Sequence, residues 1–343
     1  MDGARPVAQE PRVVCVGESM AQVVPQDGRL GTAEVFRIAT AGAESNVAAG
    51  LAALGLDASW VSAVGADPLG ERVVADLAAK GVDTSSVLTD DDAPTGVFFK
   101  DPSPEGSRVH YYRAGSAASR MDASVADVVL AAAPTWVHVS GVTSALSPSC
   151  RELVASLLRR ARSSGVRTTF DVNYRPRLWG DRESAAAAIA EAAALADTVL
   201  VGLDEAQDLW HVDTPEDIRA LLPQPETIVV KDGSRYAVRL GHADTVTVPA
   251  LAVDVVEPVG AGDAFAAGWI AATARGADAA TALRLGHLVA GRALLSLDDH
   301  PELTDREALL VRATDPHGEW PAETRTFPVA AEATSPTAQE QTS

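Results

Sequence analysis

The chain has 343 residues, of which 47% are hydrophobic and 22% are charged, as in an ordinary globular protein. Its formal net charge of −19 argues against a nucleic-acid partner, because nucleic-acid binding depends on neutralising phosphates. No apolar run reaches about 18 residues and the start lacks a signal-peptide pattern, so we expect no membrane partner. Two cysteines argue against a disulfide framework and predict a cytoplasmic protein.

Short β-branched runs alternate with Ala- and Leu-rich stretches along most of the chain. We predict strands at 13–16, 60–64, 136–139, 167–172, 198–201 and 227–230. We predict helices at 45–54, 71–79, 151–163, 185–195, 263–274 and 279–297. This alternation predicts an α/β fold, in which helices cover both faces of a mostly parallel sheet.

Two segments, 22–38 and 95–113, carry extended patterns, and neither contains a helical stretch. We expect them to form a small antiparallel β-strand lid over the C-terminal edge of the main sheet, where α/β proteins bind ligands. The sequence shows no repeat and no linker, so we predict a single domain over 12–312. Residues 1–11 and 318–343 are expected to be disordered, since the tail lacks a periodic apolar pattern.

The first motif is a glycine turn, Gly42-Ala43-Glu44-Ser45-Asn46, that leads into a helix. The Asn46 amide suits a sugar hydroxyl because it both donates and accepts hydrogen bonds. Helix capping by Ser45 or Asn46 explains the same residues equally well. A second turn, 64–70, has Pro68 at an early helical position and reads as structural.

Tyr111 and Arg113 alternate along a predicted lid strand, so they share a face. This pairing suits a ligand with hydroxyls and a carboxylate, and an exposed edge strand with a solvated Arg is the alternative. The segment 171–175 follows a strand end, where Arg175 is able to bind a carboxylate through two nitrogens. An Asx turn before Pro176 is the competing explanation.

Glu205 begins a helix after the strand at 198–201. A carboxylate there is suited to hold Mg²⁺ through water molecules. A favourable charge near the helix N-terminus is the simpler explanation for one Glu. The histidines lack metal-ligand spacing, and no Ser-His-Asp arrangement is readable in the sequence.

The most informative stretch is Val259-Gly260-Ala261-Gly262-Asp263, which runs directly into an apolar helix. Glycines let the backbone approach an anion, and the first helical turn offers unpaired N–H groups to it. Asp263 lies where it can accept the proton of an alcohol that attacks a phosphoryl group. An ordinary N-cap is the competing explanation for this Asp.

Two other phosphate-binding motifs are excluded. A Walker A loop needs Gly-Lys, and none of the lysines, Lys80, Lys100 and Lys231, follows a glycine. The dinucleotide fingerprint would require glycine at position 265, where the chain has Phe265. A nucleotide-binding oxidoreductase is therefore disfavoured.

In order and spacing, the glycine turn with Asn46, the turn at 64–70 and the Gly260–Asp263 loop resemble those of ribokinase-like carbohydrate kinases. The resemblance covers about residues 12–312 and implies the three-layer α/β/α core of that family. Within the family, the chain is most similar to 2-keto-3-deoxygluconate kinases. The segments that carry this closer match are 42–48, 111–117, 139–143, 171–175 with 178–179, and 299–300.

The resemblance implies that Asp263 is the catalytic base and that the backbone of Gly260, Ala261 and Gly262 forms an anion hole. It implies a sugar-acid site formed by Gly42, Asn46, Phe98, Tyr111, Arg113, Val142, Arg175, Asp263 and Asp299. It also implies that ATP contacts Asn173, Lys231, Gly233, Ser234, Arg235, Tyr236, Gly260 and Gly262.

The chain departs from the family pattern at four places. Gly202 replaces an Asn three residues before Glu205, which weakens the assignment of Glu205 to Mg²⁺. Phe98 replaces a substrate-contacting Tyr and removes one hydroxyl contact. Glu257 replaces an Asp upstream of the glycine loop, where its longer side chain changes how a cation is handled. The stretch 233–236 lacks the usual second glycine, so the adenine pocket differs in shape.

We therefore predict an ATP- and Mg²⁺-dependent kinase for the primary hydroxyl of a sugar acid, with 2-keto-3-deoxygluconate as the first candidate. Arg113 and Arg175 would hold the carboxylate against the negative net charge of the chain. A neutral sugar such as fructose or ribose, another deoxy-keto acid, and a non-catalytic sugar-binding regulator remain alternatives. The open edges of the lid predict a homodimer or higher homo-oligomer. Epimer preference and dependence on a monovalent cation stay open.

Overall fold

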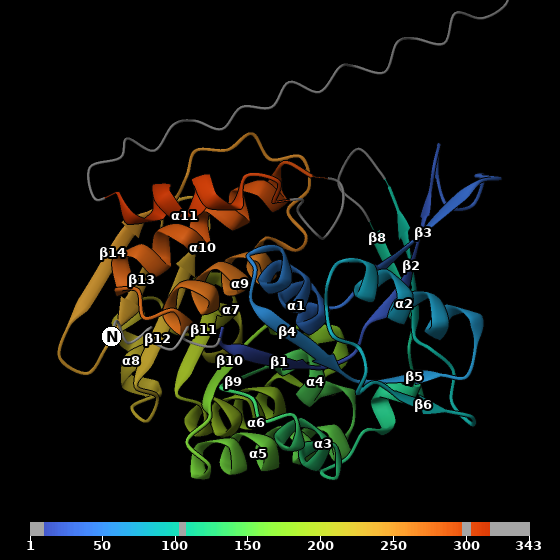
Figure 1. Cartoon of the computed structure of the whole chain (residues 1–343), viewed down its shortest axis with the longest axis horizontal. Coiled ribbons are helices and arrows are strands. Elements are labelled where there is room, and N and C mark those ends of the chain that lie inside the picture. Colours follow the sequence, from blue (N-terminus) through green and yellow to red (C-terminus); the bar gives the residue numbers. More distant parts are fainter. Residues whose placement is uncertain (1–9, 103–107, 297–302, 316–343) are drawn as a thin grey trace, which may run out of the picture.

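A central sheet of eight strands forms the body of the protein in a computed structural model that describes residues 10–102, 108–296 and 303–315 (Figure 1). The strand order across the sheet is β14-β13-β12-β11-β10-β9-β1-β4. Neighbours from β4 to β12 pair in parallel, whereas β13 and β14 are antiparallel. The strands are β1 (Arg12–Val16), β4 (Asp57–Val61), β9 (Trp136–Ser140), β10 (Arg167–Asp171), β11 (Thr198–Gly202), β12 (Thr227–Asp232), β13 (Tyr236–Leu240) and β14 (Thr245–Pro249).

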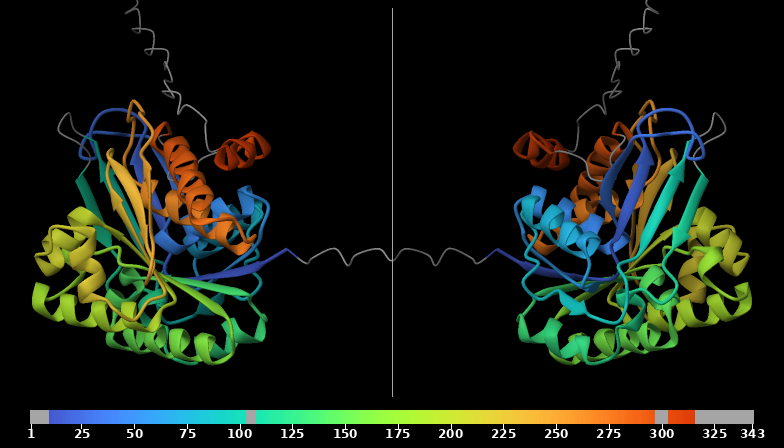
Figure 2. Two further views of the ribbon diagram at one scale, coloured as in Figure 1. Left: turned by 90° about the vertical axis from the view of Figure 1, so that its left-hand side faces the viewer. Right: turned by 90° about the vertical axis from the view of Figure 1, so that its right-hand side faces the viewer.

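Helices cover both faces of this sheet, as the two side views in Figure 2 show. One face carries α1 (Ala43–Ala53), α2 (Pro68–Ala79), α9 (Ala261–Ala274), α10 (Ala279–Leu294) and α11 (Arg306–Thr314). The other carries α3 (Val125–Ala131), α4 (Gly141–Leu146), α5 (Pro148–Ser163), α6 (Arg182–Leu195), α7 (Leu203–Trp210) and α8 (Pro215–Leu221). The predicted three-layer α/β/α architecture is confirmed.

Alternate residues of each parallel strand enter different cores. In β1, Val13 and Cys15 pack under the helices of one face, while Val14 and Val16 pack under those of the other. A parallel sheet covered on both sides must bury both faces, so its strands read as continuous apolar runs. This pattern is why the six central strands are readable from the sequence.

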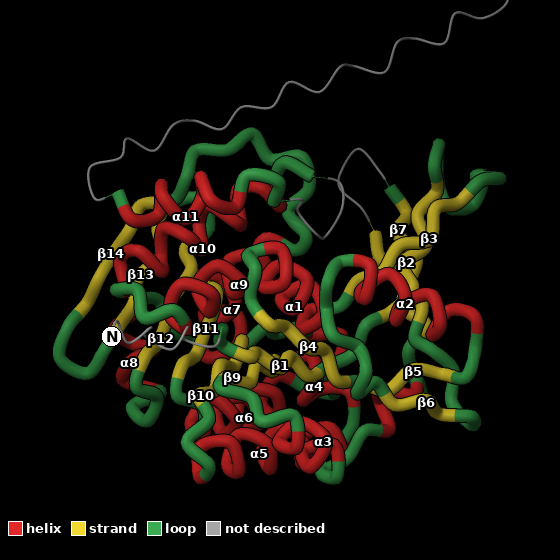
Figure 3. The backbone as a smooth tube through the Cα atoms, in the orientation of Figure 1, coloured by secondary structure: helices red, strands yellow, loops and turns green. Residues whose placement is uncertain are grey.

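A second, smaller sheet forms the lid in the order β3-β2-β7-β8 (Figure 3). The outer pairings, β2 with β3 and β7 with β8, are antiparallel as predicted, but the two central strands, β2 and β7, pair in parallel, so the lid is a mixed sheet. The chain leaves β2 through β3 and crosses the body before it returns as β7, so no hairpin forces a reversal there. The lid strands are β2 (Met20–Pro25), β3 (Phe36–Ala41), β7 (Val97–Asp101) and β8 (Arg108–Tyr112).

Several element boundaries differ from the predictions. The strand expected at 60–64 divides at Ser62 between β4 and β5 (Ala63–Gly65), and β5 pairs with β6 (Leu88–Asp90) in a separate two-stranded sheet. Apart from residues 10 and 11, the termini expected to be disordered lie outside the described residues. Within the described ranges, no helix has both the length and the apolarity needed to cross a membrane.

Candidate active site

The C-terminal ends of the parallel strands gather charged residues at one edge of the main sheet. Asp171 is the last residue of β10, and Lys231 lies next to last in β12. Lys231 is in register with Gly202, the last residue of β11. The Lys231 side chain reaches across β11 to Asp171 in β10, with Nζ to Oδ2 at 3.3 Å.

The glycine loop reaches the same edge from the start of α9. Gly260 precedes the helix with a φ of 85°, a left-handed conformation that favours glycine. A Cβ added at Gly262 would lie 3.6 Å from Lys231 Nζ, so the ammonium lies next to the loop. The first N–H groups of α9 have no intrahelical acceptor and carry the positive end of the helix dipole. The loop is therefore suited to an anion.

Asp263 lies in the first turn of α9 and is held by the first glycine turn. Asn46 Nδ2 donates a hydrogen bond to Asp263 Oδ2 at 2.8 Å, across 217 residues of sequence. Asn46 Oδ1 accepts from the Gly42 N–H at 3.4 Å, so one amide joins the two predicted motifs. Neither Asn46 nor Asp263 acts as a side-chain N-cap of its own helix.

The electrostatic surroundings of Asp263 favour its protonated form. Burial of the carboxyl among protein atoms raises its pKa to about 8, and the negative charge of Asp171 adds to the rise. The Asn46 hydrogen bond and the charges of Arg175 and Lys231 lower the pKa but do not cancel the effect of burial. A carboxyl group with such a pKa exchanges a proton near neutral pH, as a general base requires.

We call Asp171, Arg175, Glu205, Lys231 and Asp263 the sheet-edge cluster. Burial alone would lower the pKa of Lys231, but the carboxylates of Asp171 and Glu205 outweigh it and raise the pKa. Arg175 Nη1 lies 3.3 Å from Glu205 Oε1, and its side chain is 53% exposed. Arg175 is thus held loosely, with much of its guanidinium open to a ligand.

Glu205 is bonded within the protein on both oxygens. Its Oε2 accepts a hydrogen bond from the Gly202 N–H at 3.0 Å, and its Oε1 faces Arg175. A Cβ at Gly202 would lie 2.5 Å from Asp204 Oδ1 and 3.3 Å from Glu205 Oε2, so the glycine leaves room for both carboxylates. Residues 10–102, 108–296 and 303–315 contain no group of three or more potential metal ligands. These residues fit an Mg²⁺ ion carried by nucleotide phosphates and water, not a cage made of protein.

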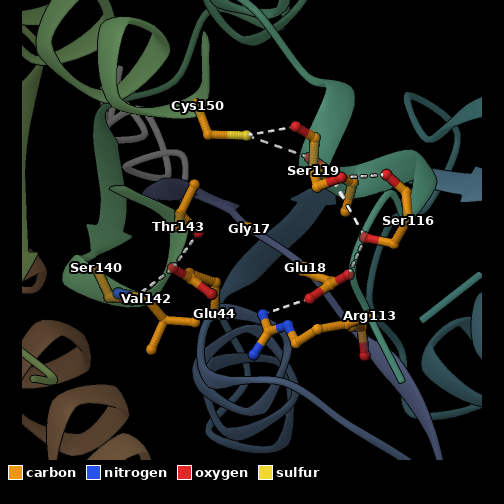
Figure 4. Close-up of polar contacts among 12 residues, drawn as sticks. Gly17, Glu18, Glu44, Arg113, Ser116, Ser119, Ser140, Val142, Thr143 and Cys150 are labelled. Carbon is orange, nitrogen blue, oxygen red and sulfur yellow. Dashed lines mark hydrogen bonds and ion pairs between the residues drawn. The ribbon is translucent and has the colours of Figure 1, made fainter. Parts of the chain in front are cut away.

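A second set of buried charges lies beside the lid (Figure 4), and we call Glu18, Glu44 and Arg113 the lid-side cluster. Arg113 forms an ion pair with Glu18, and their side chains are only 11% and 1% exposed. Ser116 Oγ donates to the other Glu18 oxygen, Oε1. Arg113 also stacks on the Tyr111 ring, 5.8 Å from its centroid, which confirms that the two share a face. The predicted solvated Arg at an exposed edge is excluded.

Glu44 joins the first glycine turn to α4. Its Oε1 accepts hydrogen bonds from Ser140 Oγ at 2.6 Å and Thr143 Oγ1 at 2.7 Å. Burial raises the pKa of this carboxyl, although the two hydroxyls and the charge of Arg113 lower it. A Cβ at Gly17 would lie 2.2 Å from the Glu44 carboxyl carbon, so only glycine fits between β1 and this acid.

The other predicted sugar-site residues surround the lid-side cluster. The rings of Phe98 and Tyr111 lie 5.6 Å apart on the inner lid face. Val142 follows Ser140, whose Oγ accepts its N–H at 3.1 Å. A Cβ at Gly42 would lie 2.2 Å from the Glu18 carbonyl oxygen. Asp299 lies outside the described residues.

The predicted nucleotide residues follow the ends of β10 and β12. Asn173 has a φ of 36°, and no described group hydrogen-bonds its buried Oδ1, so the predicted Asx turn is not formed. The turn from Gly233 to Tyr236 links β12 to β13 beside Lys231. Gly233 has a φ of 49°, and Arg235 Nη2 donates to Asp232 Oδ1 at 2.7 Å.

Sequence analysis assigned no role to two acids of this region, Glu18 and Glu44. Glu18 lies two residues after the end of the buried parallel strand β1, and this signal was available. Glu44 was part of a quoted motif, but nothing local indicated that its carboxyl turns inward to Ser140. The turn at 64–70 is structural as predicted, because Asp67 caps α2 by accepting from the Leu69 and Gly70 N–H groups.

Comparison with known proteins agrees with this geometry. The model of the pfkB family of carbohydrate kinases matches residues 10–300. The chain is 34% identical to the 2-dehydro-3-deoxygluconokinase of Bacillus subtilis over 308 residues, which cover 86% of this chain and 93% of that protein. It is 33% identical to the 2-dehydro-3-deoxygalactonokinase of Haloferax volcanii, over 80% of this chain and 88% of that one.

Solved structures give the same fold. The crystal structure of a PfkB protein from Polaromonas sp. JS666 is 36% identical and superposes with a TM-score of 0.77, over 84% of this chain and 97% of that one. A putative ribokinase II from E. coli, in complex with ATP and Mg²⁺, is 23% identical with a TM-score of 0.78, over 88% and 99% of the two chains. The second likeness concerns the fold alone.

Proposed function

The chain belongs to the pfkB family of carbohydrate kinases, and we propose that it transfers the γ-phosphoryl group of ATP to 2-dehydro-3-deoxygluconate. The observation that carries the proposal is the joint placement of Asp263, the glycine loop and the partly exposed Arg175 at one sheet edge. The names of the Bacillus and Haloferax relatives support a 2-keto-3-deoxy sugar acid as the acceptor. Their nearly equal identities leave the choice between the gluco and galacto epimers to experiment.

In the proposed mechanism, Asp263 accepts the proton of the sugar's primary hydroxyl as this oxygen attacks the γ-phosphorus atom, the bond from that phosphorus to the bridging oxygen breaks, and ADP leaves. Asn46 orients the carboxylate by holding its Oδ2. The amides of Gly260, Ala261 and Gly262 stabilise negative charge on the transferring group, with Lys231 beside them. When bound, Mg²⁺ neutralises charge on the ATP phosphates. The lid closes over the sugar and limits transfer to water.

The two predicted carboxylate-binding arginines differ in availability, so we assign them different parts. Arg175 is 53% exposed and contacts Glu205 at 3.3 Å, which allows it to turn toward the sugar carboxylate. Arg113 is compensated by Glu18 and is almost wholly buried, so it serves as a fixed wall of the sugar site. A bidentate contact from Arg175 would give the acid its advantage over a neutral sugar.

ATP consumption with Mg²⁺ across a panel of sugars tests the proposal. The panel contains 2-dehydro-3-deoxygluconate, its galacto epimer, gluconate, fructose and ribose. We expect turnover confined to the two keto acids. Turnover on fructose or ribose alone would reject the proposed contact between Arg175 and the sugar carboxylate. No turnover on any of the five sugars would favour a sugar-binding regulator. Assays in K⁺ and in tetramethylammonium decide whether a monovalent cation is needed.

We further propose that residues 12–312 form one domain and that two copies associate through their lids. The strands β3 and β8 are open edges of the lid sheet, and Phe36 and Tyr112 expose apolar surface there, at 38% and 67%. Light scattering coupled to gel filtration tests the dimer, and Tyr112→Lys should shift it to a monomer.

The two buried, unpaired cysteines support a cytoplasmic location, which cell fractionation would test.

A further inference from the structure

A buried lysine of the lid contacts the loop that leads into α9. Lys100 lies in β7, where alternation places it on the same face as Phe98, toward the body of the protein. Its Nζ lies 3.8 Å from Glu257 Oε2, and the two side chains are only 6% and 17% exposed. A buried ammonium is costly unless it is paired, so this contact restrains both segments.

Glu257 continues this connection toward the glycine loop. Its Oε1 accepts a hydrogen bond from the Val259 N–H at 3.3 Å, one residue before Gly260. Its own backbone is anchored at the end of α10, because the Val256 and Glu257 N–H groups donate to the Leu294 carbonyl. One carboxylate thus joins the lid, through Lys100, to the turn that sets the direction of the loop amides.

We propose that Glu257 is a positioning residue for phosphoryl transfer, and that its pair with Lys100 couples the position of the lid to the placement of the 260–262 amides. The sugar contacts the lid and the transferring phosphoryl group contacts the amides, so the pair links the two substrates. This inference rests on the kinase activity, and it holds whether or not the acceptor is a sugar acid.

Amide hydrogen exchange of the ligand-free protein tests the link without any substrate. Lys100→Met removes the lid charge, and we expect amides 259–263 to exchange at least about fivefold faster, as for a coupling of ordinary strength. Arg29→Met is the matched control, because Arg29 pairs with Asp101 of the same strand but stays within the lid. Unchanged exchange at 259–263 in Lys100→Met, or an equal change in Arg29→Met, would overturn the proposal.

Kinetics with the sugar that the enzyme phosphorylates provide the second readout. Lys100→Met and Glu257→Gln should each lower kcat by at least about fivefold and change the KM for ATP by less than about twofold. The amide introduced by Glu257→Gln keeps an acceptor for the Val259 N–H, so this variant isolates the ion pair. The double variant should be no worse than Lys100→Met alone. If the decreases in kcat were additive in the double variant, or if both single variants kept the wild-type kcat, the proposed role of the ion pair would be refuted.

Lys100→Arg distinguishes the loss of the positive charge from a general loss of structure at position 100. It keeps the positive charge, so it should retain rapid turnover and slow exchange at 259–263. If Lys100→Met does not fold, Lys100→Gln replaces it in both experiments. Equal exchange and equal kcat in Lys100→Gln and Lys100→Arg would overturn the proposal, because charge would then be irrelevant.

Discussion

The two buried charge clusters beside the site differ in how tightly their members are bonded. In the lid-side cluster, Arg113 is 11% exposed and paired with Glu18, and Glu44 receives two short hydroxyl hydrogen bonds. In the sheet-edge cluster, the ion pairs that Lys231 forms with Asp171 and Arg175 forms with Glu205 each measure 3.3 Å, and Arg175 is half exposed. Short, enclosed contacts fix a structure, whereas longer contacts at an open edge leave charge available to ligands.

The difference also appears in what each cluster holds together. The lid-side acids join segments that are distant in sequence, since Glu18 binds the end of the lid and Glu44 binds α4. The sheet-edge groups surround a single carboxyl group, Asp263, whose pKa burial raises to about 8. We therefore expect substitutions in the first cluster to change stability and substitutions in the second to change kinetics.

The largest expected effect is on turnover. Asp263→Asn removes the proton acceptor and should lower kcat by about 10²- to 10⁴-fold, the range ascribed to general acid–base catalysis. Binding of ATP, measured by calorimetry, should remain close to that of the wild type because the loop amides are unchanged. A kcat near the wild-type value would exclude Asp263 as the base.

A stability experiment probes the other cluster. Glu18→Ala leaves Arg113 buried without its partner and should cost about 3–5 kcal/mol of unfolding free energy. Glu152→Ala is the control, because Glu152 pairs with Arg159 at the surface and should cost no more than about 1 kcal/mol. Denaturant unfolding measures both variants. Equal costs would show that the lid-side pair is not structural.

Arg175→Ala sharpens the contrast between the two arginines. Loss of a charge-assisted contact worth about 1.5–3 kcal/mol should raise the KM for the sugar acid by roughly 10- to 150-fold. The KM for ATP and the melting temperature should change little, since this arginine is half exposed. An equal rise in both KM values would argue against a carboxylate contact.

The pH dependence follows from the raised pKa of Asp263. The base acts when ionised, so kcat/KM should fall about tenfold per unit as the pH drops below about 8. The folded state binds the proton of Asp263 more tightly than the unfolded state does. Protonation of this carboxyl therefore stabilises the fold at low pH, and that stabilisation is lost as the pH rises from the usual pKa of 3.8 to about 8. Asp263→Asn should lack that loss in a pH series of thermal melts. A flat rate profile between pH 6 and 9 would contradict the assignment.

The smallest expected effect concerns Phe98, one of the predicted sugar-site residues on the lid. Phe98→Tyr restores the hydroxyl that the family usually has at this position. One hydrogen bond of about 0.5–1.5 kcal/mol should lower the KM for the sugar acid by roughly 2- to 10-fold. The pair of rings at positions 98 and 111 should stay intact, so kcat should not change. An unchanged KM would indicate that the added hydroxyl does not reach the substrate.

The parallel core was predictable because its strands are buried on both faces and read as apolar runs. The antiparallel strands β13 and β14 and the parallel pairing within the lid were not, because strand direction depends on distant connections. The glycine motifs indicated an anion site, but the bond between Asn46 and Asp263 spans 217 residues, and local sequence carries no signal of it. The same limit concealed the partners of Arg113 and Glu44, which only the folded chain brings together.

The most direct test of the kinase proposal is ³¹P NMR of the reaction of ATP, Mg²⁺ and 2-dehydro-3-deoxygluconate. With the wild-type protein, we predict ADP together with a phosphomonoester of the sugar acid, and with Asp263→Asn we predict unchanged ATP. ADP with inorganic phosphate and no sugar ester, or the same ester formed at the same rate by both proteins, would contradict the account.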